Sequence, residues 1–409
     1  MSDTEETFSD LRILLRGQGL ALCATLLLAF VGMGIVFPVM PLYLRTLGAT
    51  GTILGLMVAV YGLGEGIFAF VWGSLADRIG ITIPLGVQMF GGGLCMVAFA
   101  FIPLLGAIFV LRFVVATLSS AIWPTGRGYL AHSVPPSSKG LAMALFGILA
   151  SGGMSIGAFI SGVFVDQWGF PFVFLASAVL SFVAGTIVLS QLRGARIVRG
   201  KTMGTGERAT SDLAITGDDG TFTHTIVILS IIVVLISCAF TSNLTLLPLL
   251  ITEVAGLAPT DVGVVFGMAG MVALVLLMPA GRLSDRVGRK LVLVSGLGLC
   301  LLAAVGLAYV RSYWPILLFA VLNSVGRWAT DPPILSLLSD ITPLRHQGRS
   351  QGIFVVAWDL GMIVGPVIAG MIWDRAGPQP TYLFLAAVVA ICVAVTFLLE
   401  TRPKSVMTN

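Results

Sequence analysis

The chain has 409 residues, of which 57% are hydrophobic and only 10% are charged, and its formal net charge is +4. A soluble domain would carry roughly 25% charged residues, so the composition excludes an ordinary soluble protein. The small positive balance gives no indication of nucleic-acid binding. Ionised side chains are expensive in hydrocarbon, and we therefore expect most of this chain to lie in a lipid bilayer.

Twelve apolar stretches are long enough to cross a bilayer, since a membrane-spanning helix needs about 20 apolar residues. The first six lie at residues 19–44, 52–72, 83–104, 105–131, 140–165 and 170–192. The other six lie at residues 223–250, 260–280, 291–310, 313–340, 350–373 and 378–399. The sequence thus predicts an N-terminal six-helix bundle at 1–192 and a C-terminal six-helix bundle at 223–409. Residues 193–222, rich in Gly, Thr and Arg, are typical of a flexible cytoplasmic linker.

The positions of lysine and arginine predict how the chain is oriented. Seventeen of the 23 basic residues fall on the side of the two termini and the linker, and only Arg45, Arg311 and Arg375 fall on the other side. Cytoplasmic loops of membrane proteins carry the excess of positive residues. We therefore expect a multi-pass protein of the cell's inner (plasma) membrane with both termini in the cytoplasm.

A ten-residue segment occurs twice in the chain. Gly73–Thr82 (GSLADRIGIT) returns 208 residues later as Gly281–Lys290 (GRLSDRVGRK). The same offset relates Pro124 to Pro332, and it relates Asp166–Gly169 to Asp374–Gly377. A register kept over most of each half indicates that the two halves are copies of one six-helix unit, as in transporters with a central binding site.

The repeated pattern Gly-x-Leu-x-Asp-Arg-x-Gly resembles the signature of the major facilitator superfamily. The resemblance implies an all-α membrane protein in which twelve transmembrane helices form two pseudo-symmetric six-helix bundles. It also implies rocker-switch alternating access, in which the bundles pivot about a site near the middle of the membrane.

The resemblance further implies a conformational latch at the cytoplasmic side. There each motif aspartate would face the start of a helix in the other half, where the helix dipole stabilises a carboxylate. The alternative is that these aspartates are ordinary turn residues. The predicted latch comprises Gly73, Asp77, Arg78, Gly80, Gly281, Asp285, Arg286, Gly288 and Asp340.

Two further patterns are similar to those of the twelve-span drug:proton antiporters. In span one, Val31-Gly32 is followed after five residues by Pro38–Pro41 (PVMP), although such prolines also simply bend membrane helices. Span eleven carries the glycine–proline pattern that this branch shows in span five, where our chain lacks the proline. Small residues four apart also favour tight helix packing. The residues expected to do so are Gly153, Gly157, Gly162, Gly361, Gly365, Pro366 and Gly370.

Ionisable residues inside spans are candidates for function because they are costly there. Burial favours the neutral form of a carboxylate, so Glu65 could take up and release a proton. The resemblance places Arg112 where the family has a membrane arginine that interacts with the coupling carboxylate. We predict Glu65, Arg112 and Asp359 as proton-coupling residues. The alternatives are that an arginine neutralises Glu65 and that Arg112 is a structural hydrogen-bond anchor.

Arg327 and Asp331 are one helical turn apart and can pair along one helix face. Together with Asp359 they would either bind a polar substrate or form a closed ion network between spans ten and eleven. Aromatic residues add an adaptable apolar surface. The predicted substrate cavity comprises Arg127, Asn243, Arg327, Asp331, Tyr61, Trp123 and Trp358.

These features predict a secondary active transporter and not an enzyme, with proton-coupled efflux of hydrophobic or amphiphilic small molecules, as in multidrug resistance. The alternative is proton-coupled or facilitated uptake of a small metabolite such as an organic anion. The chain has no nucleotide-binding Gly-x4-Gly-Lys-Ser/Thr loop and only three histidines, so we expect no cofactor and no metal. The expected partners are a small-molecule substrate, protons and the lipid bilayer, without nucleic acid, and the expected state is a monomer.

Overall fold

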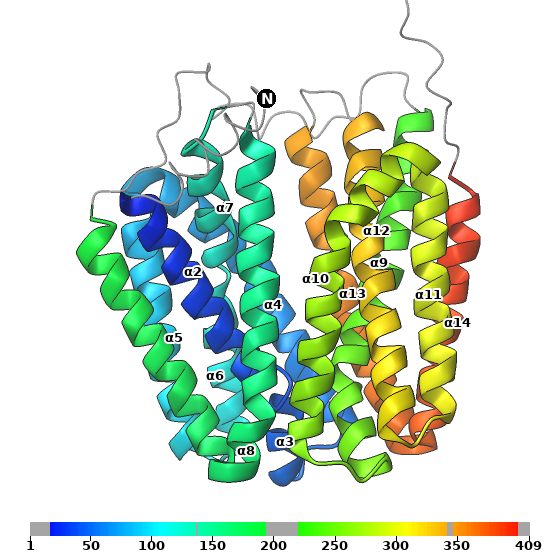
Figure 1. Ribbon diagram of the computed structural model, residues 1–409, viewed down its shortest axis with the longest axis horizontal. Coiled ribbons are helices and arrows are strands. Elements are labelled where there is room, and N and C mark those ends of the chain that lie inside the picture. The colour runs from blue at the N-terminus through cyan, green and yellow to red at the C-terminus, as the bar shows by residue number, and fades with distance from the viewer. Residues whose placement is uncertain (1–16, 136–137, 194–219, 342–346, 400–409) are drawn as a thin grey trace, which may run out of the picture.

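A computed structural model describes the backbone of residues 17–135, 138–193, 220–341 and 347–399. It describes the side chains in these ranges except those of residues 220–224, 277–287 and 339–351. Every regular element in the described ranges is a helix, and Figure 1 shows the helices running roughly alongside one another. Most of the predicted linker at 193–222 lies outside the described residues.

The N-terminal half contains long helices interrupted by breaks. They are α2 (Gly17–Val36), α3 (Met40–Thr46), α4 (Gly51–Ile79), α5 (Thr82–Phe101), α6 (Leu105–Ser119), α7 (Ile122–His132) and α8 (Lys139–Gln191). Pro38 follows the end of α2, where a residue without a backbone N–H cannot continue the helical hydrogen bonds. α8 covers two predicted spans, and it kinks at Gly169, whose φ of +78° lies in the left-handed region.

The C-terminal half repeats this plan. Its helices are α9 (Gly220–Leu249), the π-helical turn η2 (Leu250–Val254), α10 (Pro259–Val287), α11 (Arg289–Tyr309), α12 (Tyr313–Ile341), α13 (Gln347–Ala376) and α14 (Pro378–Phe397). Ten helical segments among the described residues are long and apolar enough to span a membrane. α8 holds two spans, and α12 is not among the ten because residues such as Arg327 and Asp331 reduce its hydropathy. Helices thus occupy all twelve predicted spans.

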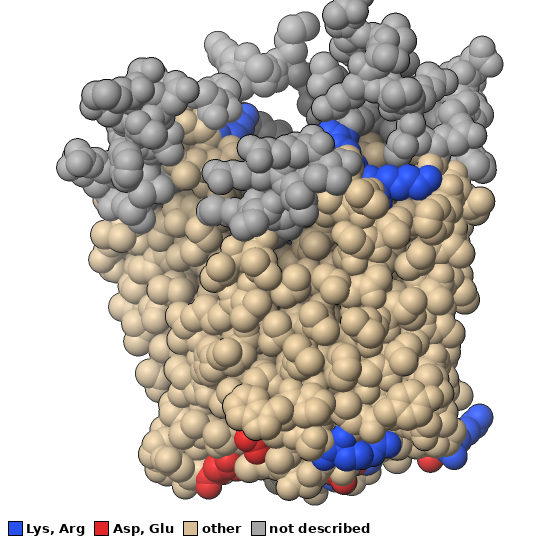
Figure 2. All heavy atoms as spheres, turned by 45° about the vertical axis from the view of Figure 1, so that its right-hand side comes forward, with Lys and Arg blue, Asp and Glu red and all other residues tan. Residues whose placement is uncertain are grey.

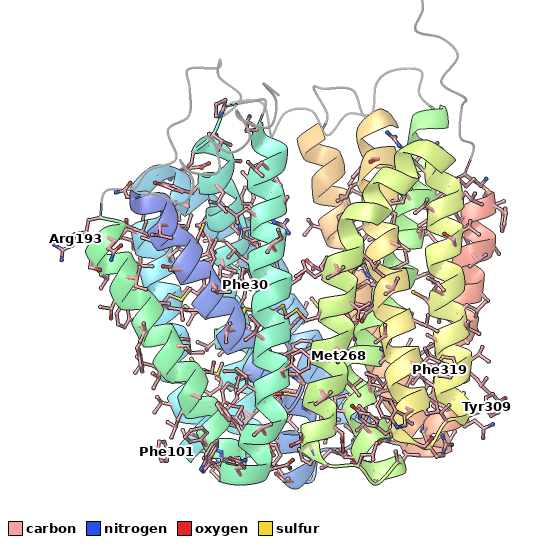
Figure 3. All side chains as sticks on the ribbon, viewed as in Figure 1. Phe30, Phe101, Arg193, Met268, Tyr309 and Phe319 are labelled. Atoms are coloured by element: carbon pink, nitrogen blue, oxygen red, sulfur yellow. The ribbon has the colours of Figure 1, made fainter. Side chains whose placement is uncertain are left out.

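Lipid-facing side chains form an apolar surface around the helices. Figure 2 shows charged residues gathered near the two ends of the visible face, with a broad uncharged belt between them. Phe101 and Tyr309, labelled in Figure 3, are largely exposed near one end of the belt, whereas Phe30 is fully buried. The protein is a multi-pass membrane protein.

One end of the molecule joins the two halves. We call it the outer end, following the predicted orientation, and it carries α3, η2 and the turns that precede α4 and α10 (Figure 1). A single apolar core there draws residues from both halves, including Val39 and Leu54 from the first half and Leu250 and Trp373 from the second. Toward the opposite, inner end, each half has a core of its own. Buried apolar contact therefore holds the halves together mainly at the outer end.

Glycines on α4 and α10 let the two halves approach closely. α4 packs along α13, and α10 packs along α8. Gly55 faces the backbone of Pro366, and its counterpart Gly263 faces the backbone of Ala158. A side chain at either glycine would collide with backbone atoms of the opposite half. The helices can therefore approach this closely only because both positions lack a side chain.

Glycines also pack the helices within each half. Gly153 and Gly157 of α8 face the backbone of α2, near Phe30 and Val31. In the second half, Gly361 and Gly365 of α13 face the backbone of α9 in the same manner. The repeated small residues thus occupy equivalent helix crossings.

Candidate functional site

Two carboxylates from opposite halves lie near each other on α4 and α13. Glu65 lies on α4, and it interacts electrostatically with Asp359 of α13. Asp359 lies against Gly66, where a Cβ atom would be only 2.5 Å from its Oδ2 atom. Further toward the inner end, Gly73 of α4 faces Pro124 of its own half.

Arg112 and two aromatic residues surround Glu65 on the side of the first half. The Arg112 guanidinium carbon lies 4.5 Å from the centre of the Tyr61 ring, and Arg112 interacts electrostatically with Glu65. The Tyr61 hydroxyl is 2.9 Å from Ser119 Oγ. Trp123 of α7 also interacts with the Glu65 carboxyl group. The structure thus brings together four residues that the sequence analysis selected separately.

Arg127 is exposed although its helix lies in the bundle. Its guanidinium carbon lies 5.1 Å from the ring centres of both Trp123 and Phe146. It also interacts electrostatically with Asp331 of the opposite half. Arg127 and Asp331 therefore attract each other across the two halves, whereas Glu65 and Asp359 repel each other.

Arg327 pairs with a carboxylate and two aromatic rings in the second half, although its buried Nε atom has no hydrogen-bond partner among the described residues. It is 7% exposed, and its Nη1 atom donates to Asp331 Oδ1 at 2.5 Å. Its guanidinium carbon lies 5.2 Å from the Phe240 ring centre and 4.5 Å from that of Trp358. The pairing predicted from the four-residue spacing is present. Asp359 lies against Gly66 of α4 instead, so the described ion network between α12 and α13 is smaller than the sequence allowed.

Asn243 is buried on α9, away from lipid. Its side-chain oxygen has no hydrogen-bond partner among the described residues. A buried amide oxygen without a partner is unfavourable, so a water molecule or a ligand is needed to satisfy it.

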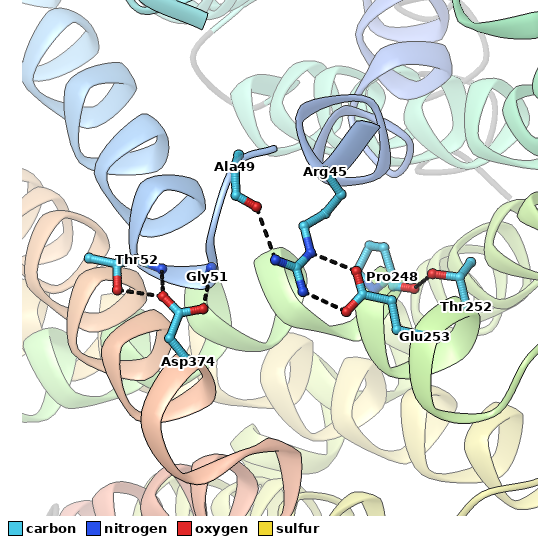
Figure 4. A network of polar contacts seen from close by, with 8 residues as sticks. All are labelled: Arg45, Ala49, Gly51, Thr52, Pro248, Thr252, Glu253 and Asp374. Atoms are coloured by element: carbon cyan, nitrogen blue, oxygen red, sulfur yellow. Dashed lines mark hydrogen bonds and ion pairs between the residues drawn. The ribbon is translucent and has the colours of Figure 1, made fainter. Parts of the chain in front are cut away.

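The outer end carries a polar network that the sequence analysis did not identify (Figure 4). Arg45 Nε and Nη2 each donate to a different carboxylate oxygen of Glu253 at 2.6 Å. Asp374 accepts hydrogen bonds from the backbone of Gly51 at 2.6 Å and from that of Thr52 at 2.8 Å. Both contacts join the two halves, and Asp374 caps the N-terminus of α4.

The outer network follows the internal repeat. Asp166 is the counterpart of Asp374, and it accepts hydrogen bonds from the backbone and hydroxyl groups of Thr260 at the start of α10. Arg45 and Glu253 are themselves 208 residues apart. They occupy the same position of the two halves and meet each other. The 208-residue offset was the sequence signal for this network, although it does not show which residues touch.

The predicted inner latch is only partly described. Gly80 ends α4 with a φ of +88°, and Gly288 precedes α11 with a φ of +108°, a left-handed conformation that favours glycine. Asp77 and Arg78 are exposed near this end. The side chains of Asp285, Arg286 and Asp340, and the surroundings of Gly281, lie outside the described residues, so the latch stays a prediction.

Comparison with known proteins agrees with this architecture. The model of the family described as "Major Facilitator Superfamily" matches residues 22–212 and 229–409. The chain is 26% identical over 368 residues to the multidrug resistance protein MdtG of Proteus mirabilis, covering 88% of this chain and 89% of MdtG. It is 25% identical over 382 residues to the quinolone resistance protein NorA of Staphylococcus aureus, covering 92% of this chain and 95% of NorA.

Solved structures show the same fold at low sequence identity. A bacterial homologue of the human lysosomal transporter Spinster, crystallised in an inward-facing and unoccupied conformation, matches with a TM-score of 0.77 and 14% identity, over 95% of this chain and 96% of that one. A structure of the nucleoside transporter NupG matches with a TM-score of 0.78 and 13% identity, over 93% and 98%. The match of the family model to nearly the whole chain confirms the family predicted from the repeated motif. The chain belongs to the major facilitator superfamily, and it is a secondary transporter rather than an enzyme.

Proposed function

We propose that the protein exports hydrophobic or amphiphilic small molecules in exchange for protons. The observation that carries this proposal is the meeting of Glu65 and Asp359 across the two halves. Two ionised carboxylates at close range repel each other. A proton on either of them removes that repulsion and allows α4 and α13 to stay in contact.

This arrangement would link proton binding to the conformation of the protein. With a proton bound, the outer end stays closed and the cavity is accessible from the inner side. After the proton leaves toward the inner side, repulsion between Glu65 and Asp359 favours separation of α4 from α13. Bound substrate would then be carried to the outer side and released there. A new proton would bind from that side after the substrate has left. A ligand shifts such an equilibrium only by its preference for one state, and the proton has this preference here.

The aromatic residues near these charges support an apolar or amphiphilic substrate. Tyr61 and Trp123 in the first half, and Phe240 and Trp358 in the second, stack against arginines. Such rings offer a large apolar area with little loss of side-chain entropy. The names of MdtG and NorA, which refer to multidrug and quinolone resistance, support the same class of substrate. We further propose that the inner end and both termini face the cytoplasm.

Transport in proteoliposomes tests the proposal. The purified protein is reconstituted, a pH gradient is imposed, and movement of a lipophilic cationic dye is followed by fluorescence. We expect Glu65→Gln and Asp359→Asn each to abolish the response to the pH gradient while leaving the protein folded, because neither replacement side chain can release a proton.

The matched control is Asp261→Asn. Asp261 is a carboxylate in the first turn of α10 that accepts a hydrogen bond from the backbone of Ala258, just before the same helix, so its replacement should leave transport unchanged. Full pH-driven transport by Glu65→Gln would refute the proposed role of the carboxylate pair.

A further inference from the structure

Arg112 has no hydrogen-bond acceptor or ion-pair partner among the described residues. A guanidinium group carries five N–H donors, and the contacts of Arg112 are the face of Tyr61 and a longer-range interaction with Glu65. Arg112 is only partly exposed, and a charged group with little access to water and no partner costs several kcal/mol. Water or a small ion in the adjoining cavity can offset this cost.

Arg327 provides an internal comparison. It is also an intramembrane arginine stacked on aromatic rings, but it forms an ion pair with Asp331. The cavity beside Arg327 has a volume of only about 20 Å³. The arginine that has a carboxylate partner thus has little empty space next to it.

The cavity beside Arg112 is larger, with a volume of about 80 Å³. A single water molecule needs roughly 10–15 Å³ by this measure, so this cavity can hold a small ion together with water. Residues from α2, α4, α5, α6 and α8 line it, all of them in the first half. Its polar lining consists of Arg112, Tyr61, Gln88, Ser119, Ser177 and Ser181.

Gln88 supplies a second, independent indication of a missing ligand. It lies on α5, it is only 6% exposed, and its Oε1 atom has no hydrogen-bond partner among the described residues. The oxygen and nitrogen of a glutamine amide are assigned from their surroundings, so this group can equally present its NH2 donors to the cavity. Arg112 and Gln88 together then offer positive charge and N–H donors, and the other polar groups that line the cavity are uncharged hydroxyls.

We propose that this cavity inside the N-terminal helices is a binding site for a small monovalent anion, held by Arg112 and the Gln88 amide. The anion would supply the negative charge that Asp331 supplies to Arg327. Glu65 is the only acidic group that interacts with Arg112 in the described part of the chain, and it also faces Trp123 and Asp359. When Glu65 carries a proton, the bound anion becomes the sole counter-charge of Arg112.

Thermal unfolding of the purified full-length protein in detergent tests the site. Sodium chloride and sodium acetate are each titrated against sodium gluconate at constant ionic strength. We expect chloride, acetate or both to raise the unfolding midpoint in a saturable manner, because ligands that bind only the folded state stabilise it. Gluconate is too large for the cavity and should have no effect. The order of potency shows whether the site prefers an inorganic ion or a carboxylate.

Variants assign the effect to the cavity. Arg112→Gln should remove the anion response, and Gln88→Leu should weaken anion affinity by about tenfold or more, as expected for loss of one hydrogen bond to a charged group. Glu65→Gln should strengthen it, because a competing negative charge is lost. Arg327→Gln is the matched control and should retain the response.

Two results would overturn the proposal. One is the same unfolding midpoint in chloride, acetate and gluconate. The other is an unchanged anion response in Arg112→Gln or, where that variant does not fold, in Gln88→Leu. These measurements need no transport, so they stand apart from the proposed export activity. A protein that binds the anion but moves no dye would retain this site and lose the proposed function.

Discussion

Because Gly66 has no side chain, a carboxylate of the opposite half can lie directly against α4. Asp359 comes from the opposite half, and it occupies the space in which a Cβ atom of residue 66 would lie. The neighbouring Glu65 carboxylate is thereby brought near Asp359. The position of Gly66 matters because this contact exists only while the outer end is closed.

Gly66→Ala should therefore shift the protein away from the described conformation. The added methyl group displaces the Asp359 carboxylate, and overpacking of this kind costs about 1–3 kcal/mol. We expect the open-outward state to gain population by roughly fivefold to a hundredfold. Spin-label distances across the outer end would measure this shift. Gly298→Ala is the control, since nothing lies within 4 Å of a Cβ atom there, and equal distance distributions in the two variants would contradict the prediction.

At the scale of the helices, each half caps a helix of the other. Asp374 of α13 caps α4, and Asp166 of α8 caps α10. A carboxylate at a helix N-terminus accepts hydrogen bonds from N–H groups that have no partner within the helix, and it interacts favourably with the helix dipole. The proposed opening of the outer end would break these two contacts, so their energy would stabilise the closed state alone.

Removing either cap should favour outward opening. We expect Asp374→Ala and Asp166→Ala each to reduce the stability of the closed outer end by about 0.5–2 kcal/mol. Their effects should add in the double variant because the sites share no partner. The rate at which a cysteine placed behind the closed end reacts with an external thiol reagent reports the change. Asp261→Ala, which removes a hydrogen bond at the start of α10 that stays within one half, should leave this rate as it is in the parent.

The helix α12 illustrates what sequence can and cannot predict. The four-residue spacing of Arg327 and Asp331 was enough to predict their ion pair, because both residues lie on one helix. The partner of Asp359 could not be found in this way, because α13 presents it to α4 of the other half. Contacts between halves depend on how two separately folded surfaces meet, and helical periodicity carries no information about that.

For the whole molecule, the sequence was sufficient for the fold. The architecture of two six-helix bundles was predicted from the span lengths, the 208-residue repeat and the paired motifs. Each of these can be found from local composition or by comparing one half of the sequence with the other. The repeat includes Asp166 and Asp374, but it did not predict the hydrogen bonds that these residues make at the outer end. Their role depends on which helix N-terminus lies opposite, and that is set by the conformation in which the halves meet.

In the proposed mechanism, the outer end with its shared core must open for transport. We expect that linking positions 45 and 253 across it will stop the transport cycle. In the double variant Arg45→Cys with Glu253→Cys, a bifunctional thiol reagent that forms disulfides should abolish dye transport, and a reductant should restore it. The five native cysteines are buried, which limits background reaction. Each single variant treated with the reagent is the control, and transport that continues in the linked double variant would contradict a rocking mechanism.

The ion pair between Arg45 and Glu253 has a consequence for the origin of the protein. A residue on the axis that relates two copies meets its own counterpart, so two identical halves would place arginine against arginine or glutamate against glutamate. Opposite charges at this point are possible only once the copies have ceased to be interchangeable. An ancestor assembled from two equal six-helix subunits would have needed a neutral or self-complementary side chain here, and the present pair therefore arose after the two halves had diverged.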